Sequence, residues 1–211
     1  METLFLALIA LGAYLLGSFS TGILVSGKKD VDIRSLGSHN TGASNVTRVM
    51  GLGWGLVTFG GDAAKTALSC LLSLLLLPSG CWDCPALGLM VAGLFSVVGH
   101  NWPVYYGFKG GKGVACSLCA ILFVNPTLGL VSVLLCVLVI ALTRYISLGS
   151  LTMLFSFFLL NLLNCLFQWG GCFRWFYPVF GALLLVFGVI RHRENLGRLL
   201  RGEERKLGER A

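Results

Sequence analysis

Three polar segments interrupt an otherwise apolar chain, and each contains residue types that bind anions. The segments are 32–48 (DIRSLGSHNTGASNVTR), 99–115 (GHNWPVYYGFKGGKGVA) and 191–198 (RHRENLGR). Glycines let successive main-chain amides converge on an anion, and arginine or lysine side chains add positive charge. The segments hold no pair of carboxylates placed for acid–base work and no metal-ligand cluster. The pattern therefore favours a phosphorylated substrate or a phosphate leaving group, and no metal.

In the first segment, Gly37 and Gly42 permit the tight turns that would shape an anion-binding concavity. Short donors and guanidinium groups surround these glycines, namely Arg34, Ser38, Asn40, Asn45 and Arg48. We expect the segment to lead into an apolar helix, whose N-terminus would add a favourable dipole. The alternative is an ordinary solvated loop in which the serine and asparagine side chains cap a helix.

The second segment superficially resembles a nucleotide-binding P-loop but lacks two of its residues. Tyr106 stands where that loop has its first glycine, and Gly113 replaces the serine or threonine that should follow Lys112. A nucleotide is therefore disfavoured, although main-chain amides beside Lys112 still suit a phosphate. His100 lies near the predicted membrane surface, either as a ligand contact or as a structural histidine bonded to neighbouring main chain.

The third segment follows the last apolar run directly. Helical spacing would bring Glu194, Asn195 and Arg198 near one another on one face. A simple positively charged membrane anchor is the alternative, although such an anchor needs only lysine and arginine.

Charged and polar residues outside these segments add to the candidate set. Asp62 and Lys65 lie near the inner end of an apolar run, where charges usually face a polar cavity or each other. Arg144 and Ser147 are further polar groups on the same predicted side of the membrane. Asp62 and Lys65 could pair with each other, or Lys65 could extend its ammonium group to the membrane surface. Asp62, Lys65 and Ser147 are candidates for contact with a ligand.

The composition indicates which elements must position these residues. The chain has 211 residues, of which 56% are hydrophobic and only 12% are charged, about half the charged fraction of a soluble domain. We therefore expect an all-α, polytopic integral membrane protein. The net charge of +7 is spread over short segments between apolar runs. That distribution is typical of loops facing anionic lipid and of sites for anionic ligands, and it argues against nucleic acid as a partner.

Apolar runs of about 17 to 25 residues are long enough to cross a bilayer. The runs lie at about 4–25, 51–77, 86–104, 113–124, 127–143, 149–168 and 175–190. We predict about seven spans, with five or six as alternatives because the fourth run is short. Asn125-Pro126 is expected to form the tight turn that ends that run.

The orientation follows from the lysines and arginines. With the N-terminus outside, the inner segments are 26–50, 105–112, 144–148 and 191–211, and they hold 14 of the 16 basic residues. The positive-inside rule then places the N-terminus outside and the C-terminus in the cytoplasm.

Most of the eight cysteines lie singly inside apolar runs, where we expect buried, hydrophobe-like thiols. Cys81 and Cys84 have CxxC spacing but no second pair or nearby histidines, so zinc is disfavoured. If their loop faces outward, Cys81 and Cys84 could form a disulfide with each other, and Cys172 is an alternative partner.

Taken together, the motifs resemble the acyl-phosphate:glycerol-3-phosphate acyltransferase family of the PlsY type. The resemblance is carried by Gly-Ser-x-Asn-x-Gly-Ala-x-Asn-x-x-Arg at 37–48, by Gly-His-x-Trp-Pro…Phe-Lys-Gly-Gly-Lys-Gly-Val-Ala at 99–115 and by His-Arg-x-Asn-x-x-Arg at 192–198. Gly-Asp-x-x-Lys at 61–65 and Ser-Leu-Gly at 147–149 also fit. The order and spacing of these motifs agree along essentially the whole chain.

The resemblance implies a bacterial enzyme of the inner membrane, with seven helices and a cytoplasmic active site. It implies transfer of a fatty acyl group from acyl phosphate to glycerol 3-phosphate, which gives lysophosphatidic acid and inorganic phosphate. Neither acyl-CoA nor acyl carrier protein would serve as donor, and no cofactor is needed. We expect one transmembrane domain over 1–211, functional as a monomer.

On this basis we assign Ser38, Arg48, Lys112 and Asn195 to the catalytic core. The expected substrate-binding residues are Arg34, Gly37, Asn40, Gly42, Asn45, Asp62, Lys65, His100, Lys109, Gly110, Gly111, Ser147, His192 and Arg198. The base is His100, His192 or, as the resemblance favours, the phosphate of glycerol 3-phosphate itself, because its second pKa lies at about 6 to 7.

Two positions depart from the family pattern, with His39 in place of the usual glycine and Thr41 in place of the usual proline. These changes would alter the rigidity of the turn, and His39 would add a donor. One rival function is anion transport. Transporters usually bind their substrate near the middle of the membrane, whereas the polar residues here are predicted at the inner end only. Another rival is a purely structural or non-catalytic role in the membrane.

Overall fold

The structure is a computed structural model that describes residues 2–76, 85–168 and 174–209. Within these ranges the chain is helical and contains no strand, which confirms the all-α prediction. The chain divides into two compact units, the first formed by residues 1–123 with 208–211 and the second by 124–207. That the whole chain acts as one domain stays a prediction.

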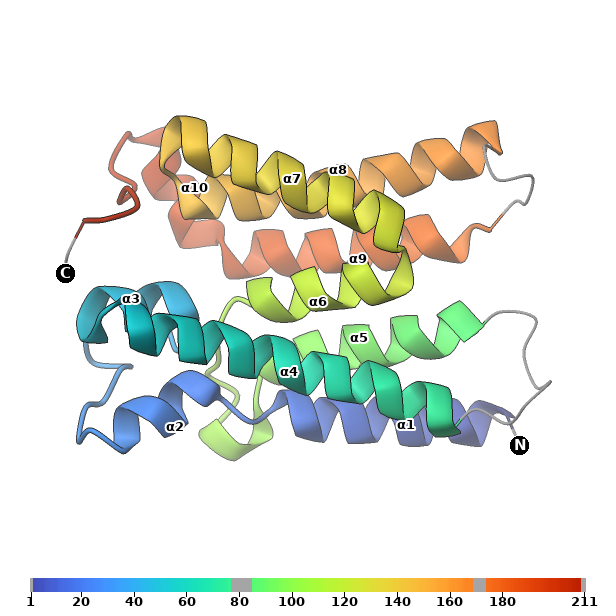
Figure 1. Cartoon of the computed structure of the whole chain (residues 1–211), viewed down its shortest axis with the longest axis horizontal. Coiled ribbons are helices and arrows are strands. Elements are labelled where there is room, and N and C mark those ends of the chain that lie inside the picture. Colours follow the sequence, from blue (N-terminus) through green and yellow to red (C-terminus); the bar gives the residue numbers. More distant parts are fainter. Residues whose placement is uncertain (1, 77–84, 169–173, 210–211) are drawn as a thin grey trace. The chain divides into compact units, whose positions relative to one another are not determined.

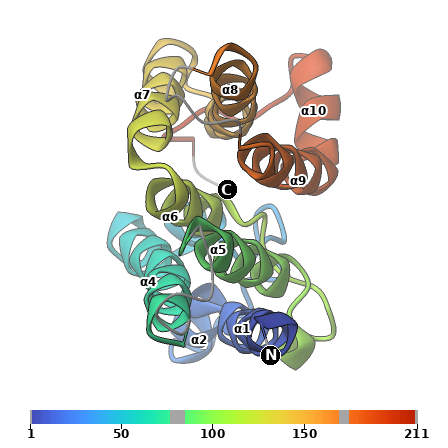
Figure 2. The same ribbon diagram turned by 90° about the vertical axis from the view of Figure 1, so that its right-hand side faces the viewer.

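The first unit contains α1 (Glu2–Gly17), α2 (Thr21–Gly27), α3 (Ala43–Met50), α4 (Leu52–Leu76), α5 (Pro85–Asn101), the short 3-10 helix η1 (Val104–Tyr106) and α6 (Val114–Val124). Helix α1 packs against α4 and α5, and these two also pack against each other (Figures 1 and 2). A Cβ added at Gly17 would lie 2.3 Å from the carbonyl oxygen of Ser96, and one at Gly99 would lie 2.2 Å from that of Tyr14. The glycines therefore permit close packing of α1 and α5.

The expected first span is not one continuous helix. The structure breaks the 4–25 run after Gly17, and α2 begins at Thr21. The Ser20 side chain caps α2 by accepting a hydrogen bond from the amide of Ile23 at 3.4 Å. Because the break takes the chain out of the helical ladder, main-chain groups between the two helices become available to other partners.

The helix that follows the first polar segment also differs from expectation. Instead of leading directly into the apolar span, the chain forms α3, whose last turn contains Arg48. Helix α3 ends at Gly51, where φ is 95°, a left-handed value that favours glycine. The apolar helix α4 begins only after this break.

The second unit contains α7 (Pro126–Thr143), α8 (Ile146–Phe167), α9 (Phe176–Arg191) and α10 (Arg193–Leu200), with α8 packed against both α7 and α9. The Asn125 side chain caps α7 by accepting from the amide of Leu128 at 3.2 Å, and Pro126 follows it. The predicted boundary at Asn125-Pro126 is thus confirmed. Helices α9 and α10 meet at His192 with a bend of 66°.

Among the described residues, five helical segments are long and apolar enough to cross a membrane, or six if the bent pair α9–α10 counts as one span. Helix α6 is apolar but has only 11 residues. Each of the predicted apolar runs is helical over most of its described residues, with the first run interrupted between α1 and α2. The number of crossings and the orientation of the termini stay predictions. Five cysteines are buried, as expected, namely Cys70, Cys116, Cys119, Cys136 and Cys165. Cys81, Cys84 and Cys172 lie outside the described residues.

Candidate active site

The first polar segment is shaped by the side chain of Asn45, the third residue of α3. Its amide nitrogen donates to the carbonyl oxygens of Ile33, Leu36 and Asn40 at 2.9 to 3.2 Å. Its amide oxygen accepts from the main-chain N–H of Ser38 at 2.8 Å. Because Asn45 is only 1% exposed, these contacts indicate that it organises the loop around Ser38.

Two further predicted binding residues of this segment are held by local contacts. The Asn40 side-chain oxygen accepts from the amide of Gly42 at 2.9 Å and forms the turn that leads into α3. The Arg34 guanidinium pairs with the Asp32 carboxylate at 3.0 Å on the exposed side of the loop. Hydrogen bonds from Arg34 hold the pKa of Asp32 below its ordinary value.

The structure shows how His39 and Thr41, the two departures from the family pattern, are accommodated in the loop. His39 has a φ of 56°, in the left-handed region that favours glycine. Its Nδ1 lies 3.0 Å from the carbonyl oxygen of Arg34. Thr41 is buried, and its hydroxyl oxygen has no hydrogen-bond partner within the described part of the chain. A proline at position 41 would bring no hydroxyl to bury.

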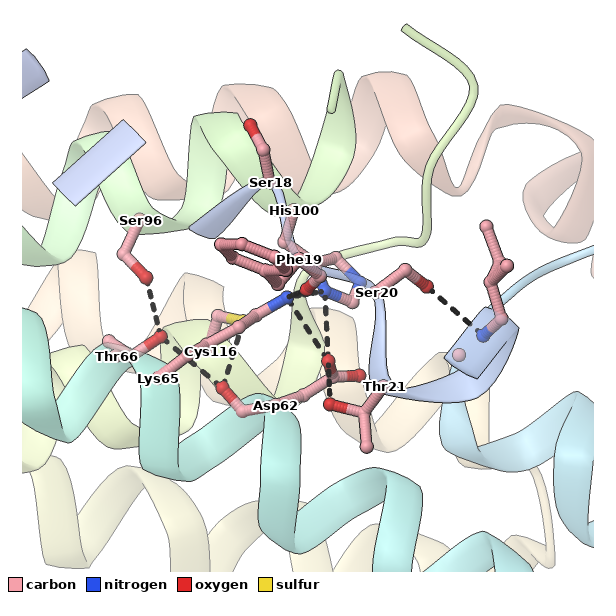
Figure 3. Close-up of polar contacts among 12 residues, drawn as sticks. Ser18, Phe19, Ser20, Thr21, Asp62, Lys65, Thr66, Ser96, His100 and Cys116 are labelled. Atoms are coloured by element: carbon pink, nitrogen blue, oxygen red, sulfur yellow. Dashed lines mark hydrogen bonds and ion pairs between the residues drawn. The ribbon is translucent and has the colours of Figure 1, made fainter. Parts of the chain in front are cut away.

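The ionisable residues Asp62, Lys65 and His100 meet inside the first unit (Figure 3). The Lys65 Nζ lies 3.1 Å from Asp62 Oδ1 and 3.0 Å from His100 Nδ1. The His100 Nδ1 is 3.6 Å from the same Asp62 oxygen. The three residues are 2%, 9% and 5% exposed, respectively. Mutual pairing, which was one of the two alternatives for Asp62 and Lys65, is therefore observed.

Residues from two other elements complete this cluster, and the motifs did not predict them. Thr21 donates to Asp62 Oδ1 at 3.2 Å, and the Cys116 thiol donates to the main-chain carbonyl of Asp62 at 3.3 Å. The Lys65 ammonium also donates to the carbonyl of Phe19, which lies in the break between α1 and α2 (Figure 3). The signal that could have revealed this was the polar run Ser18-Phe19-Ser20-Thr21 inside an apolar stretch.

The glycine loop between η1 and α6 lies directly against His100. The Gly111 amide donates to the main-chain carbonyl of His100 at 3.1 Å. Gly110 and Gly111 are buried, whereas Lys112 is half-buried and Lys109 exposed. Positive φ values of 63°, 61° and 73° at Gly107, Phe108 and Gly113 turn the chain around this loop. The loop thus presents two lysines just before the N-terminus of α6.

In the second unit, Asn195 and Arg198 of the third polar segment meet at a carboxylate that the motifs did not predict. Glu204 Oε1 accepts from the Asn195 amide and from the Ser147 hydroxyl, the latter at 2.8 Å. Glu204 Oε2 accepts from Arg198 Nε, also at 2.8 Å. A turn at Gly202, where φ is 71°, precedes the glutamate. Burial would raise the pKa of Glu204, but hydrogen bonds from Asn195, Ser147 and Arg198 outweigh it and lower that pKa.

The tail that carries Glu204 is also bound at its far end. The main-chain groups of Arg144 and Leu207 hydrogen-bond at 2.7 Å, and the Arg144 guanidinium donates to the Leu207 carbonyl at 2.7 Å. In the same unit, His192 Nδ1 lies 2.8 Å from the carbonyl of Gly188. A carbonyl only accepts, so Nδ1 carries the proton and Nε2 is the acceptor of the neutral ring.

The predicted catalytic residues thus fall into both units. Ser38, Arg48 and Lys112 belong to the first unit, and Asn195 belongs to the second together with His192, Arg198 and Ser147. Within each unit, the structure brings predicted residues against a carboxylate, the buried Asp62 in the first and the half-buried Glu204 in the second. Direct contact of any of these residues with a substrate stays a prediction.

Comparison with known proteins identifies the family of this chain. Residues 7–202 match the family model described as glycerol-3-phosphate acyltransferase. The glycerol-3-phosphate acyltransferase of Thermus thermophilus is 42% identical to this chain over 204 residues, which cover 94% of each protein. That of Aquifex aeolicus is 40% identical over 210 residues, which cover 98% of this chain and 100% of the relative.

Solved structures agree with these relatives. Two crystal structures of PlsY, an integral membrane glycerol 3-phosphate acyltransferase, match 96% of this chain. The glycerol 3-phosphate form has a TM-score of 0.82 at 35% identity, and the lysophosphatidic acid form has a TM-score of 0.79 at 34% identity. The matches cover 96% and 95% of those chains. The chain therefore belongs to the glycerol-3-phosphate acyltransferase family of the PlsY type and is an acyltransferase of the membrane.

Proposed function

We propose that this enzyme transfers a fatty acyl group from acyl phosphate to the 1-hydroxyl of glycerol 3-phosphate. The products are lysophosphatidic acid and inorganic phosphate, in the first step of phospholipid synthesis. The hydroxyl oxygen attacks the acyl carbonyl carbon and forms the new ester bond. The bond between that carbon and the bridging oxygen then breaks, and phosphate leaves with the electron pair.

The observation that carries this proposal is the glycine loop before α6. Lys109 and Lys112 flank two buried glycines, and the main chain of Gly111 is hydrogen-bonded to His100. Such a loop suits a phosphate rather than an adenine nucleotide. Acyl phosphate is an activated donor with a good leaving group, so the enzyme mainly has to position the hydroxyl and stabilise developing negative charge. A cationic, donor-rich site meets this requirement.

We assign Ser38, Arg48, Lys112 and Asn195 to the reacting groups. The main chain around Gly110 and Gly111, held by the bond from the Gly111 amide to the His100 carbonyl, would contact the acyl-phosphate head together with Lys109. Arg34, His192 and Arg198 would bind phosphate oxygens. Asn45 and Asn40 support this set through the loop contacts described above. Gly37, with a φ of 63°, supplies a turn of the same loop, and Gly42 is the N-cap residue of α3.

The proton of the attacking hydroxyl would pass to the phosphate of glycerol 3-phosphate. His100 is a poor base because its Nδ1 already faces the donor-only Lys65 ammonium at 3.0 Å. His192 has its acceptor on Nε2 and is the remaining histidine candidate. The variant His192→Ala tests the histidine route, since a kcat near the wild-type value at saturating substrate would eliminate a histidine base.

We place the enzyme in the bacterial inner membrane with seven crossings, the N-terminus outside and the site on the cytoplasmic side. The distribution of basic residues supports this orientation. We further propose that the enzyme acts as a monomer.

The test of this function is a donor comparison with purified enzyme and labelled glycerol 3-phosphate. Palmitoyl phosphate is the donor in one reaction and palmitoyl-CoA in the other. We expect labelled lysophosphatidic acid from palmitoyl phosphate alone, and its loss in Lys112→Ala. Lys28→Ala, an exposed lysine outside the motifs, is the matched control and should retain activity.

Product from palmitoyl-CoA would contradict the donor that we propose. Product that persists in Lys112→Ala would contradict the part assigned to the glycine loop. Absence of product from both donors would favour anion transport instead.

A further inference from the structure

The space beside the glycine loop is filled by His100. A Cβ added at Gly111 would lie 2.0 Å from His100 Nε2, a distance that no real contact allows. A Cβ at Gly110 would lie 2.1 Å from the main-chain oxygen of His100. The same oxygen accepts from the Gly111 amide at 3.1 Å. The position of His100 therefore determines where Gly110 and Gly111 can lie.

His100 is in turn fixed by the charges behind it. Lysine ammonium groups have donors only, so the 3.0 Å contact of Lys65 Nζ requires His100 Nδ1 to be the acceptor. That arrangement puts the ring proton on Nε2, which faces Gly111. Asp62 and the Phe19 carbonyl hold the Lys65 ammonium in place from its other sides (Figure 3).

The far end of the loop is attached to the same turn of α4. Cys116, in the first turn of α6, donates to the main-chain carbonyl of Asp62. Between them, Gly113 lies close to Asn101, since a Cβ at Gly113 would be 2.6 Å from the Asn101 amide oxygen. The glycine loop is thus held at its start by His100 and at its end by Cys116, and both residues contact the Asp62–Lys65 turn.

We propose that Asp62, Lys65 and His100 are positioning residues that set the shape of the glycine loop for the acyl-phosphate donor. The three residues are almost fully buried and contact each other and the main chain, so their effect reaches the donor through the loop. The inference rests on the proposed function for the identity of the donor, but the structural part does not depend on it.

The first test is a double-mutant cycle between His100 and Gly111. The variant His100→Asn keeps an amide oxygen near the Nδ1 position to accept from Lys65 and removes the atoms that face Gly111. Gly111→Ala alone should lower kcat/KM for palmitoyl phosphate at least about tenfold because of the Nε2 contact. In the His100→Asn background the same change should cost less than about twofold, a coupling within the usual range for touching residues.

Gly110→Ala is the matched control for this cycle. Its added methyl would meet main-chain oxygen and Pro103, which His100→Asn leaves in place. The loss of activity caused by Gly110→Ala should therefore be the same in both backgrounds. Equal costs of Gly111→Ala in both backgrounds would overturn the positioning role of the ring.

The second test reads loop order directly and needs no substrate. Hydrogen exchange of peptides covering 105–113 is compared between the wild type and Lys65→Met in detergent, with peptides from 146–167 as the internal reference. We expect faster exchange in 105–113 and unchanged exchange in the reference. Unchanged exchange in 105–113 would overturn the proposal.

The two tests separate failure of this inference from failure of the proposed function. In a folded Lys65→Met variant we also expect KM for palmitoyl phosphate to rise more than KM for glycerol 3-phosphate. An equal rise in both KM values would contradict a role specific to the donor loop. Absence of product from palmitoyl phosphate with the wild type would contradict the proposed donor. If exchange in 105–113 still becomes faster in Lys65→Met, the role of Lys65 in ordering the glycine loop is supported independently of the donor.

Discussion

The two units each place predicted active-site residues against a carboxylate, but they do so in different ways. In the first unit, Asp62 is 2% exposed and pairs with Lys65, whose ammonium also contacts His100 behind the glycine loop. In the second unit, Glu204 accepts directly from Asn195 and Arg198, which are themselves assigned to the site. Asp62 should therefore affect mainly stability and loop shape, whereas Glu204 should affect catalysis directly.

The largest effect on stability is expected from unpairing the buried charges of the first unit. Asp62→Leu leaves the Lys65 ammonium buried without its carboxylate, which should lower the free energy of unfolding by about 3 kcal/mol or more. The double variant Asp62→Leu/Lys65→Met removes both charges and should recover most of that loss. Thermal unfolding in detergent measures both. A double variant no more stable than the single one would contradict the pairing.

In the second unit we expect the larger effect on turnover. Glu204→Gln keeps the size of the side chain but weakens the charge-assisted bond to Arg198, so kcat/KM should fall about 10- to 100-fold, the equivalent of about 1.5 to 3 kcal/mol. Glu203→Gln is the matched control, since that exposed carboxylate pairs with Arg201 at the surface and should change activity little. Equal losses of kcat/KM in Glu204→Gln and Glu203→Gln would contradict a direct role of Glu204 in catalysis.

The same carboxylate predicts a pH dependence of stability. Because folding lowers the pKa of Glu204 from its ordinary value of 4.5, the contacts stabilise the protein above that pH and are lost as the pH falls through the lower folded pKa. The unfolding temperature of the wild type should therefore fall more steeply from pH 5 to pH 3 than that of Glu204→Gln. Parallel pH profiles for the two proteins would contradict this.

The smallest effects are expected in the loop around Ser38. His39→Gly should relieve the left-handed backbone, and Thr41→Val should remove a buried hydroxyl oxygen that has no partner among the described residues. Each change should raise the free energy of unfolding by about 1 kcal/mol. Thermal unfolding of the single variants checks this, with Ser44→Ala, at an exposed position, as control. A loss of stability in Thr41→Val would contradict the finding that this hydroxyl is unpaired among the described residues. A loss in His39→Gly would show that the contact of His39 Nδ1 with the Arg34 carbonyl outweighs the backbone strain.

Much of the fold follows from local sequence. The apolar runs predicted helices because their lengths match helical spans, and Asn125-Pro126 marked a boundary because proline restricts the residue before it. The break after Gly17 was missed because Ser18, Phe19 and Ser20 lie in a run that is apolar on average. A carbonyl released by that break binds Lys65, a contact over 46 residues that no local pattern reveals.

The sequence predicted the site residues that belong to local motifs, but not those defined by contacts between distant parts of the chain. Glycines with lysines or arginines are visible as motifs, whereas Glu204 is a single carboxylate in a charged tail and acquires meaning only through its contacts with Ser147 and Asn195. The pairing of Asp62 with Lys65 was one of two alternatives, since i,i+3 spacing permits it without requiring it. The contact of His100 with Gly111 depends on the path of the loop and could not be derived from spacing.

The most direct test of acyl transfer from acyl phosphate follows the bridging oxygen of the donor. Palmitoyl phosphate carrying ¹⁸O in its C–O–P bridge is incubated with enzyme and glycerol 3-phosphate, and the products are analysed by mass spectrometry. Attack at the acyl carbon predicts that the label leaves in inorganic phosphate while unlabelled lysophosphatidic acid accumulates. Label retained in free palmitate, with no lysophosphatidic acid formed, would contradict acyl transfer by this enzyme.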